Sequence, residues 1–258
     1  MTRVHPTAVV DARARLADDV EVGPYAVVGA DVELGSGTVV GAHAQVQGPS
    51  TLGESNRIFP HAAVGLEPQD LKYRGEPTRL VGGARNVFRE FCTVHRGTVG
   101  GGGQTLIGDD GFFMAYSHVA HDCQIGSRVI LANYVGLAGH VHIEDGVIVG
   151  AFVGAHQFIR IGAFAFVGAY SQLRQDVLPF CKTEGTDAKT YGLNSIGLKR
   201  NGFTRERLLA LEQAYRLLIK SKLNTTQALE RIEEELPGQA DVARLVQFIR
   251  SSDRGFHR

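Results

Sequence analysis

An apolar residue recurs every six positions along most of this 258-residue chain, and this spacing constrains the fold more than any other feature. The first series runs through Val4, Val10, Leu16, Val22, Val28, Leu34, Val40, Val46, Leu52, Ile58 and Val64. The second runs through Ile107, Phe113, Val119, Ile125, Leu131, Leu137, Ile143, Val149, Ala155, Ile161, Val167 and Leu173. Neither an amphipathic helix nor a single alternating strand keeps a period of six. This period is typical of a parallel β-helix, in which short strands are joined by tight corners.

Three hexads are expected to form one triangular coil of eighteen residues. Residues eighteen apart should therefore stack at about the inter-strand spacing of 4.8 Å. The hexad residue points inward, and so does the residue two places before it, which is often small, as at Ala26 and Cys123. A glycine often follows the hexad residue, as at Gly23 and Gly35, and we expect it to adopt positive φ at a corner. Other residues that tolerate this conformation are expected at turn-like places: Asn56, Asp109 and Asn133.

Two segments, 66–80 and 95–106, interrupt the period and are predicted to be loops extruded from the solenoid. Val64 and Gly82 are eighteen residues apart, which is the length of one coil, so the first loop should leave the register intact. The second contains four consecutive glycines at 100–103 and shifts the phase by one residue. Loops extruded from a rigid solenoid commonly bind ligands, which is the role we expect here.

The hexad pattern ends after about residue 180 and a helical pattern follows, which predicts two domains, 1–190 and 191–258. Residues 204–221 carry apolar side chains at helical spacing. Asn224 and Gln227 form a predicted capping box that opens a second helix, ending near Leu236. Residues 240–251 form a third amphipathic segment, so a small helical domain should follow the β-helix.

Composition excludes several functional classes. The formal net charge is zero, so nothing indicates nucleic acid as the main partner. No apolar stretch approaches the length of a transmembrane or export segment, which predicts a cytoplasmic protein. The three cysteines, Cys92, Cys123 and Cys181, have neither metal nor disulfide spacing, in keeping with a reducing compartment.

Histidines concentrate in the second series, at His95, His118, His121, His140, His142 and His156. Stacking by eighteen places His121 beneath Gly139 and Asp122 beneath His140, so the imidazoles should lie on adjacent coils. One imidazole oriented by a carboxylate can act as a general base near neutral pH, and His121-Asp122 supplies both groups. A metal site in this cluster is the alternative. No serine or cysteine has a nucleophile-elbow setting, which favours direct attack on an activated donor.

The hexads resemble those of the hexapeptide-repeat acyl- and nucleotidyltransferases, which implies a left-handed parallel β-helix. Six segments, spread from the first loop to the helical tail, are similar to one branch of that family, the UDP-N-acetylglucosamine O-acyltransferases of lipid A biosynthesis. They are DLKYRGEPT (70–78), TVHRGTV (93–99), HVAHDC (118–123), LAGHV (137–141), AHQF (155–158) and GLKRNGF (197–203).

The resemblance implies a reaction and three catalytic residues. His121 is the general base that takes the proton of the glucosamine 3-hydroxyl as this oxygen attacks the thioester of an (R)-3-hydroxyacyl-acyl carrier protein. Asp122 orients His121 or stabilises its charge, and the N–H of Gly139 stabilises the oxyanion. No cofactor, no metal and no covalent enzyme intermediate are implied.

The same resemblance implies the residues that bind the substrates. His95 belongs to the cluster, His118, His140 and His156 line the cleft, and Gln157 and Asn194 lie toward the nucleotide. Gln69, Asp70 and Lys72 grip the acyl or sugar end, and Arg200 meets a phosphate. The family is a homotrimer with clefts between subunits. A basic set on the helical domain is expected to receive the acidic carrier: Lys199, Arg200, Arg205, Arg207, Arg216, Lys220 and Lys222.

Three residues depart from the family pattern. Ile196 replaces an expected glutamate near the nucleotide, and Asn201 replaces a second arginine after Arg200. Ala169 stands where a glycine opens the acyl groove of long-chain enzymes, which predicts a preference for acyl chains of about fourteen carbons or fewer.

Other functions remain open at this stage. An enzyme that acylates a 3-amino analogue of the sugar would use the same base. A trimeric metal protein resembling the γ-carbonic anhydrases would need three histidine ligands across an interface. A non-catalytic scaffold would tolerate loss of His121. The later N-acyltransferase of the pathway carries an N-terminal domain before its hexads, whereas the hexads here begin at Val4.

Overall fold

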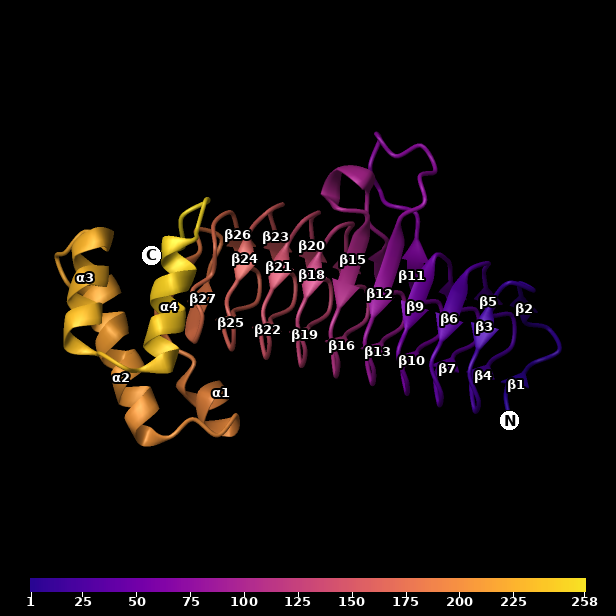
Figure 1. The fold of residues 1–258 in the computed structure, drawn as a ribbon, viewed down its shortest axis with the longest axis horizontal. Coiled ribbons are helices and arrows are strands. Elements are labelled where there is room, and N and C mark those ends of the chain that lie inside the picture. The colour runs from indigo at the N-terminus through magenta and orange to yellow at the C-terminus, as the bar shows by residue number, and fades with distance from the viewer.

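The computed structural model describes residues 1–258 and consists of a triangular prism of short strands followed by a helical region (Figure 1). All strand pairs are parallel except the last. Paired residues in successive coils are eighteen apart, as Arg3 with Glu21, except across the two loops and at the last coil, where Phe166 pairs with Lys182. From Val22 onward the inward hexad residues have almost no exposed surface and form one continuous core, whereas Val4 in the first coil is 46% exposed. This is the parallel β-helix that the hexad spacing predicts.

Three sheets form the faces of the prism. Sheet A contains β1 (Arg3–Val4), β4 (Glu21–Val22), β7 (Val39–Val40), β10 (Arg57–Ile58), β13 (Val87–Phe88), β16 (Phe112–Phe113), β19 (Ile130–Leu131), β22 (Ile148–Val149), β25 (Phe166–Val167), β27 (Cys181–Glu184) and β28 (Lys189–Leu193). Sheet B contains β2 (Val9–Val10), β5 (Val27–Val28), β8 (Gln45–Val46), β11 (Ala63–Leu66), β14 (Thr93–His95), β17 (His118–Val119), β20 (Gly136–Leu137), β23 (Gly154–Ala155) and β26 (Gln172–Leu173). Sheet C contains β3 (Arg15–Leu16), β6 (Val32–Leu34), β9 (Ser50–Leu52), β12 (Arg79–Gly82), β15 (Gln104–Ile107), β18 (Gln124–Ile125), β21 (His142–Ile143) and β24 (Arg160–Ile161).

Gly65 has positive φ (78°), as predicted, but the other glycines that follow hexad residues do not, so the prediction is wrong for those. They are required because an added Cβ would meet the backbone of the next coil, at 2.4 Å for Gly35. Positive φ occurs three residues after the hexad residue instead, for example at Tyr25. The prediction for Asn56, Asp109 and Asn133 fails too: positive φ falls on Ser55, Asp110 and Tyr134, while Asn56 points inward and donates to the carbonyl of Gly53 at 2.7 Å.

Aromatic rings occupy many of the positive-φ positions along the edge between sheets A and B, and we call this stack the aromatic ladder. Successive rings lie 4.8 to 5.1 Å apart and are nearly parallel. Its members are Tyr25, His43, His61, Phe91, Tyr116, Tyr134, Phe152 and Tyr170. The six Phe and Tyr rings remain 44% to 66% exposed, so the ladder forms a long apolar edge.

Two loops project from the same side of the prism, between β11 and β12 and between β14 and β15 (Figure 1). Val64 pairs with Val94 and Leu52 with Gly82, so the first loop adds twelve residues to one coil. The prediction that Val64 and Gly82 lie one coil apart is therefore wrong. A period of six shows the register only in multiples of six and does not show which of the three sheets a residue belongs to. Gly82 pairs with Ile107, which confirms the one-residue phase shift at the second loop.

The helical region follows an antiparallel pair, β27 and β28, and has a core of its own. The capping box of Asn224 and Gln227 is confirmed. No helix is long and apolar enough to cross a membrane. The helices are α1 (Ser195–Arg200), α2 (Arg205–Tyr215), which continues as a π-helical turn over Arg216–Lys220, α3 (Thr225–Glu235) and α4 (Ala240–Arg250).

Candidate active site

His121 and Asp122 lie at the corner between β17 and β18, directly beneath the second loop. Val119 and Cys123 point inward on either side, which leaves the two polar residues at the corner. The Nδ1 atom of His121 lies 2.7 Å from Oδ2 of Asp122. Because a carboxylate can only accept, Nδ1 carries the proton and Nε2 is left with a free lone pair. This is the arrangement of a base oriented by a carboxylate.

The next coil places Gly139 and His140 against this pair, as stacking by eighteen predicts. The imidazole of His121 lies over Gly139, where a Cβ would be 2.5 Å from Cε1 of His121 and 2.8 Å from its Nε2. The N–H of His140 donates to the carbonyl of His121 at 3.0 Å, and the ring of His140 stacks on Phe158 of the third coil at 4.3 Å. The N–H of Gly139 has no acceptor within the chain.

Asp122 is enclosed and fully hydrogen-bonded. Its side chain has no exposed surface. Oδ1 accepts from the N–H of Thr98 at 2.8 Å, and Oδ2 accepts from the hydroxyl of Thr98 at 2.6 Å as well as from His121. Thr98 is not among the site residues expected from the sequence, where its signals are its place in the loop that breaks the hexads and in the segment TVHRGTV (93–99).

Two further histidines of the predicted cluster lie beside the pair on sheet B. His118 shares a hydrogen bond of 2.7 Å between its Nδ1 and the hydroxyl of Thr93. His95 is buried edge-to-face against His118, and its Nδ1 has no partner. Burial lowers the pKa of His95 to about 4, with His118, His121 and Arg96 acting in the same direction. Burial also lowers the pKa of His118 and of His140. These imidazoles are therefore neutral at pH 7.

His95 makes the fold sensitive to acid. The unfolded chain takes up a proton at His95 near pH 6.5, whereas the folded chain does so near pH 4. We therefore expect the free energy of unfolding to fall by roughly 2–3 kcal/mol from this residue as pH drops from about 6.5 to 4. His95→Gln removes the titrating group, so the free energy of unfolding, measured with urea at each pH, should fall less steeply with decreasing pH in the variant than in the wild type. The same pH dependence in both proteins would contradict this assignment.

A groove of about 500 Å³ opens between the two loops and the corner. Asp70 and Lys72 of the first loop line it together with His140 and Phe158, so these predicted residues are brought together. Gln69 is exposed in the same loop but does not line the groove. A second hollow of about 440 Å³ lies on sheet B between His118 and His156. Gln157 is exposed at the same corner as His121, two coils on.

Other predicted residues lie apart from this site. His142 is on sheet C, and Ala169 is exposed at the other edge of sheet B, after β25. Asn194 caps α1, accepting from the N–H of Gly197 and donating to the carbonyl of Phe164. Asn194 contacts Phe164 at the edge between sheets C and A, whereas His121 lies at the edge between sheets B and C, so Asn194 and His121 of the same chain lie at different edges of the prism.

Two of the three departures, Ile196 and Asn201, and the basic set lie on the helical region. Ile196 is 68% exposed on α1, and Asn201 ends that helix, donating to the carbonyl of Gly197. Arg207 makes two hydrogen bonds with Asp241, and Arg216 pairs with Glu212. The charge of the basic set is therefore smaller than the sequence suggests.

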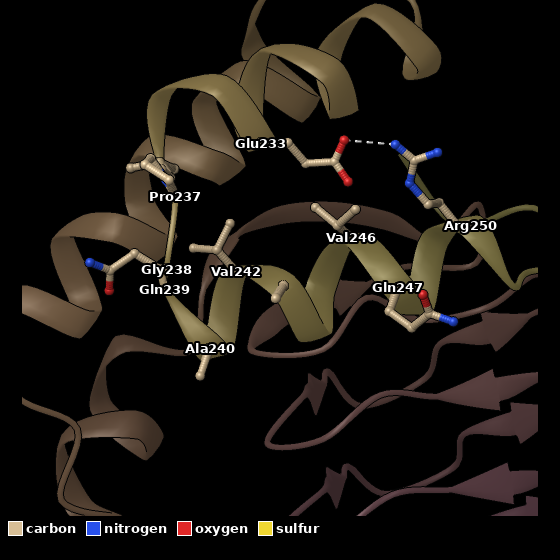
Figure 2. A pocket seen from close by; sticks show the side chains of 11 residues that line it. Glu233, Pro237, Gly238, Gln239, Ala240, Val242, Val246, Gln247 and Arg250 are labelled. Carbon is tan, nitrogen blue, oxygen red and sulfur yellow. Dashed lines mark hydrogen bonds and ion pairs between the residues drawn. The ribbon is translucent and has the colours of Figure 1, made fainter.

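A further hollow lies between α3 and α4, away from the histidines. It has a volume of about 500 Å³ and is lined by apolar side chains including Leu236, Val242 and Val246. Figure 2 shows Val242 and Val246 beneath α3, with the ion pair between Glu233 and Arg250 across one end. None of the predicted site residues lines it.

Comparisons with known families cover both parts of the chain. Residues 176–257 match the family described as Udp N-acetylglucosamine O-acyltransferase, Domain 2. Residues 13–48 and 104–139 match the bacterial transferase hexapeptide family, described as six repeats.

Individual proteins are similar over almost the whole length. The acyl-[acyl-carrier-protein]–UDP-N-acetylglucosamine O-acyltransferase of Stenotrophomonas maltophilia strain R551-3 is 53% identical over 98% of this chain and 96% of its own. The protein of that name from Halorhodospira halophila is 49% identical over the full length of both chains. Among solved structures, LpxA from Acinetobacter baumannii has a TM-score of 0.96 at 41% identity, covering 99% of each chain. The UDP-N-acetylglucosamine acyltransferase of Arabidopsis has a TM-score of 0.86 at 36% identity, covering 99% of this chain and 100% of its own.

Proposed function

Since this chain belongs to the UDP-N-acetylglucosamine O-acyltransferase family, we propose that it transfers an (R)-3-hydroxyacyl chain from acyl carrier protein to the 3-hydroxyl of UDP-N-acetylglucosamine. The observation that carries this proposal is the oriented pair of His121 and Asp122, which lies against Thr98 and His140, two residues that line a groove. Both substrates are large and anionic, so an open, rigid cleft with loops on one side suits them.

His121 acts as the general base through Nε2. It takes the proton of the sugar 3-hydroxyl while the oxygen attacks the thioester carbon of the donor. The new C–O bond forms, the C–S bond breaks, and the proton passes from His121 to the departing carrier thiolate. Asp122 keeps the proton of His121 on Nδ1 and stabilises the imidazolium that forms between these two steps.

The N–H of Gly139 supplies charge stabilisation. It has no acceptor within the chain and lies beside the imidazole, where the carbonyl oxygen of the thioester gains negative charge. One such donor, held in place before the reaction, lowers a barrier by roughly 3 kcal/mol.

Direct transfer is favoured over an acyl-enzyme intermediate. Cys123 is the thiol next to the pair, but it is fully buried, and burial raises its pKa to about 12. A thiol in this state supplies almost no thiolate near neutral pH. Attack by the sugar hydroxyl itself therefore needs no enzyme nucleophile.

The groove under the first loop and the hollow on sheet B are assigned to different parts of the substrates. Asp70 and Lys72, with Gln69 beside them, receive the acyl or sugar end in the groove under the first loop. His118 and His156 line the hollow on sheet B, with Gln157 beyond it. Asn194 and Arg200, at the two ends of α1, are assigned to the nucleotide, and because α1 begins at a different edge of the prism from His121 they come from a partner subunit.

We therefore propose a homotrimer with a site between neighbouring subunits. The aromatic ladder supports self-association, since a long apolar edge exposed on a monomer is unfavourable. Light scattering should give a mass of about three times the 27.9 kDa of one chain. Tyr134→Asp places a charge in the middle of the ladder and should shift the protein toward smaller species. A wild-type mass of a single chain contradicts the proposal.

Ala169 is proposed to limit the acyl chain. Its methyl group is exposed at the edge between sheets A and B, close to the partner in the proposed trimer. We expect the wild type to prefer donors of about fourteen carbons or fewer, and Ala169→Gly to improve kcat/KM for longer donors by roughly ten-fold relative to the shorter ones. Assays with carrier proteins loaded with graded chains measure this ratio. A wild-type preference for longer chains contradicts it.

The chemistry of the pair favours acyl transfer over the metal alternative. His121, Asp122 and His140 offer ligand atoms within 4.8 Å of one another. The oxygens of Asp122, however, already accept three hydrogen bonds, and a cation would have to displace them. The sugar acceptor is tested by supplying UDP-N-acetylglucosamine and its 3-amino analogue in parallel. An alkali-labile ester with the first confirms the proposal, and an alkali-stable amide formed only with the second rejects it.

A further inference from the structure

The second loop, residues 95–106, closes over the side chain of Asp122. It leaves the prism after β14, forms a short 3-10 turn over Val99–Gly101, and returns as β15. Thr98, just before that turn, donates its N–H to Oδ1 and its hydroxyl to Oδ2 of Asp122. One residue thus holds both oxygens of the carboxylate.

The returning strand β15 holds the backbone of Asp122. The N–H of Asp122 donates to the hydroxyl of Thr105 at 2.8 Å, and Thr105 is fully buried at the start of β15. Asp122 itself has positive φ, a conformation that aspartate tolerates but that needs support. The backbone and the side chain of Asp122 are therefore held by the two ends of the same loop.

Gly101 makes the closest approach to the carboxylate. A Cβ built at Gly101 would lie 2.0 Å from Cγ and 2.3 Å or less from both oxygens of Asp122. Its φ is not positive, so this close approach, and not a turn conformation, explains the glycine. The neighbouring Gly100 differs, because a Cβ there would meet nothing within 4 Å.

We propose that Thr98 and Gly101 are positioning residues, which set the orientation of Asp122 and, through it, the ring of His121. The inference rests on the proposed function of His121 as the base. Oδ2 is shared by the hydroxyl of Thr98 and Nδ1–H of His121, so a carboxylate that rotates away from Thr98 also releases the imidazole. A misplacement of about 1 Å in a reacting group lowers rates by roughly a hundred-fold.

The rate test compares two variants of Thr98. Thr98→Val keeps the backbone donor but removes the hydroxyl, and should lower kcat by roughly ten- to hundred-fold with little change in KM. Thr98→Ser retains the hydroxyl and should recover most of the loss. The control is Thr38→Val, which removes a buried hydroxyl far from the site and should keep wild-type kcat. Wild-type kcat in Thr98→Val, or no rescue by serine, overturns the proposal.

A second readout is independent of acyl transfer. Proton NMR of histidine-labelled protein should show the Nδ1–H of His121 as a resonance shifted downfield by its carboxylate partner. We expect it to persist in wild type, Thr98→Ser and Gly100→Ala, and to shift or broaden in Thr98→Val and Gly101→Ala. Gly100→Ala and Gly101→Ala with identical spectra overturn the proposal. If the wild type makes no acyl product but the spectra behave as expected, the proposed function fails and the positioning role stands.

Discussion

Replacing His121 by alanine is expected to lower kcat for acyl transfer by roughly a hundred- to ten-thousand-fold, with little change in KM for either substrate. The side chain is only 17% exposed and contributes one lone pair beside His140 of the groove, so its loss removes the proton acceptor and little binding surface. Steady-state kinetics with carrier-bound donor and UDP-N-acetylglucosamine measure both parameters.

His5→Ala is the matched control for this experiment. His5 is exposed at the first coil, where its Nδ1 contacts the hydroxyl of Thr7, and it should be replaceable without effect on kcat. Retained activity in His121→Ala would assign the base to another group and leave the pair of His121 and Asp122 with a structural role.

Gly139→Ala is expected to have the second large effect, a loss of roughly a hundred-fold in kcat. The added methyl would lie 2.5 Å from Cε1 and 2.8 Å from Nε2 of His121, so the imidazole must move away from the reacting hydroxyl. The φ of Gly139 is not positive, and alanine therefore fits the backbone. Kinetics and thermal unfolding together separate this effect from a loss of folding.

Gly192→Ala serves as the control for a glycine outside the site, since its Cβ would meet nothing within 4 Å. Both glycine variants should unfold near the wild-type temperature, while only Gly139→Ala should be slow. Wild-type kcat in Gly139→Ala would show that the position of the His121 ring, which the added methyl displaces, does not matter to the reaction.

The parts of the site that follow the hexads could be predicted from the sequence. In a regular solenoid each residue lies above the one eighteen places earlier, so Gly139 had to lie over His121 and His140 over Asp122. The contact of Gly139 with the imidazole and the 3.7 Å between His140 Nε2 and Asp122 Oδ2 confirm both placements. Burial of the hexad core follows from the same periodicity.

The parts that leave the hexads could not be predicted. Thr98 reaches Asp122 because of the path of an irregular loop, and no spacing in the sequence encodes that path. The positive φ predicted for the residue after each hexad residue occurs two residues later in most coils. The prediction fails because a glycine suggests positive φ even where it serves a close approach between coils. The charge of Arg207 is offset by Asp241 from another helix, a tertiary contact that a count of charges misses.

The most direct test of the account is acyl transfer by purified, chelator-treated wild-type protein from an (R)-3-hydroxyacyl-acyl carrier protein to UDP-N-acetylglucosamine. The account predicts one new product with the mass of the sugar nucleotide plus the hydroxyacyl group, esterified at the 3-oxygen, at a rate unchanged by the chelator. Absence of this product with donors of every length, or product formed only after metal is restored, would contradict it.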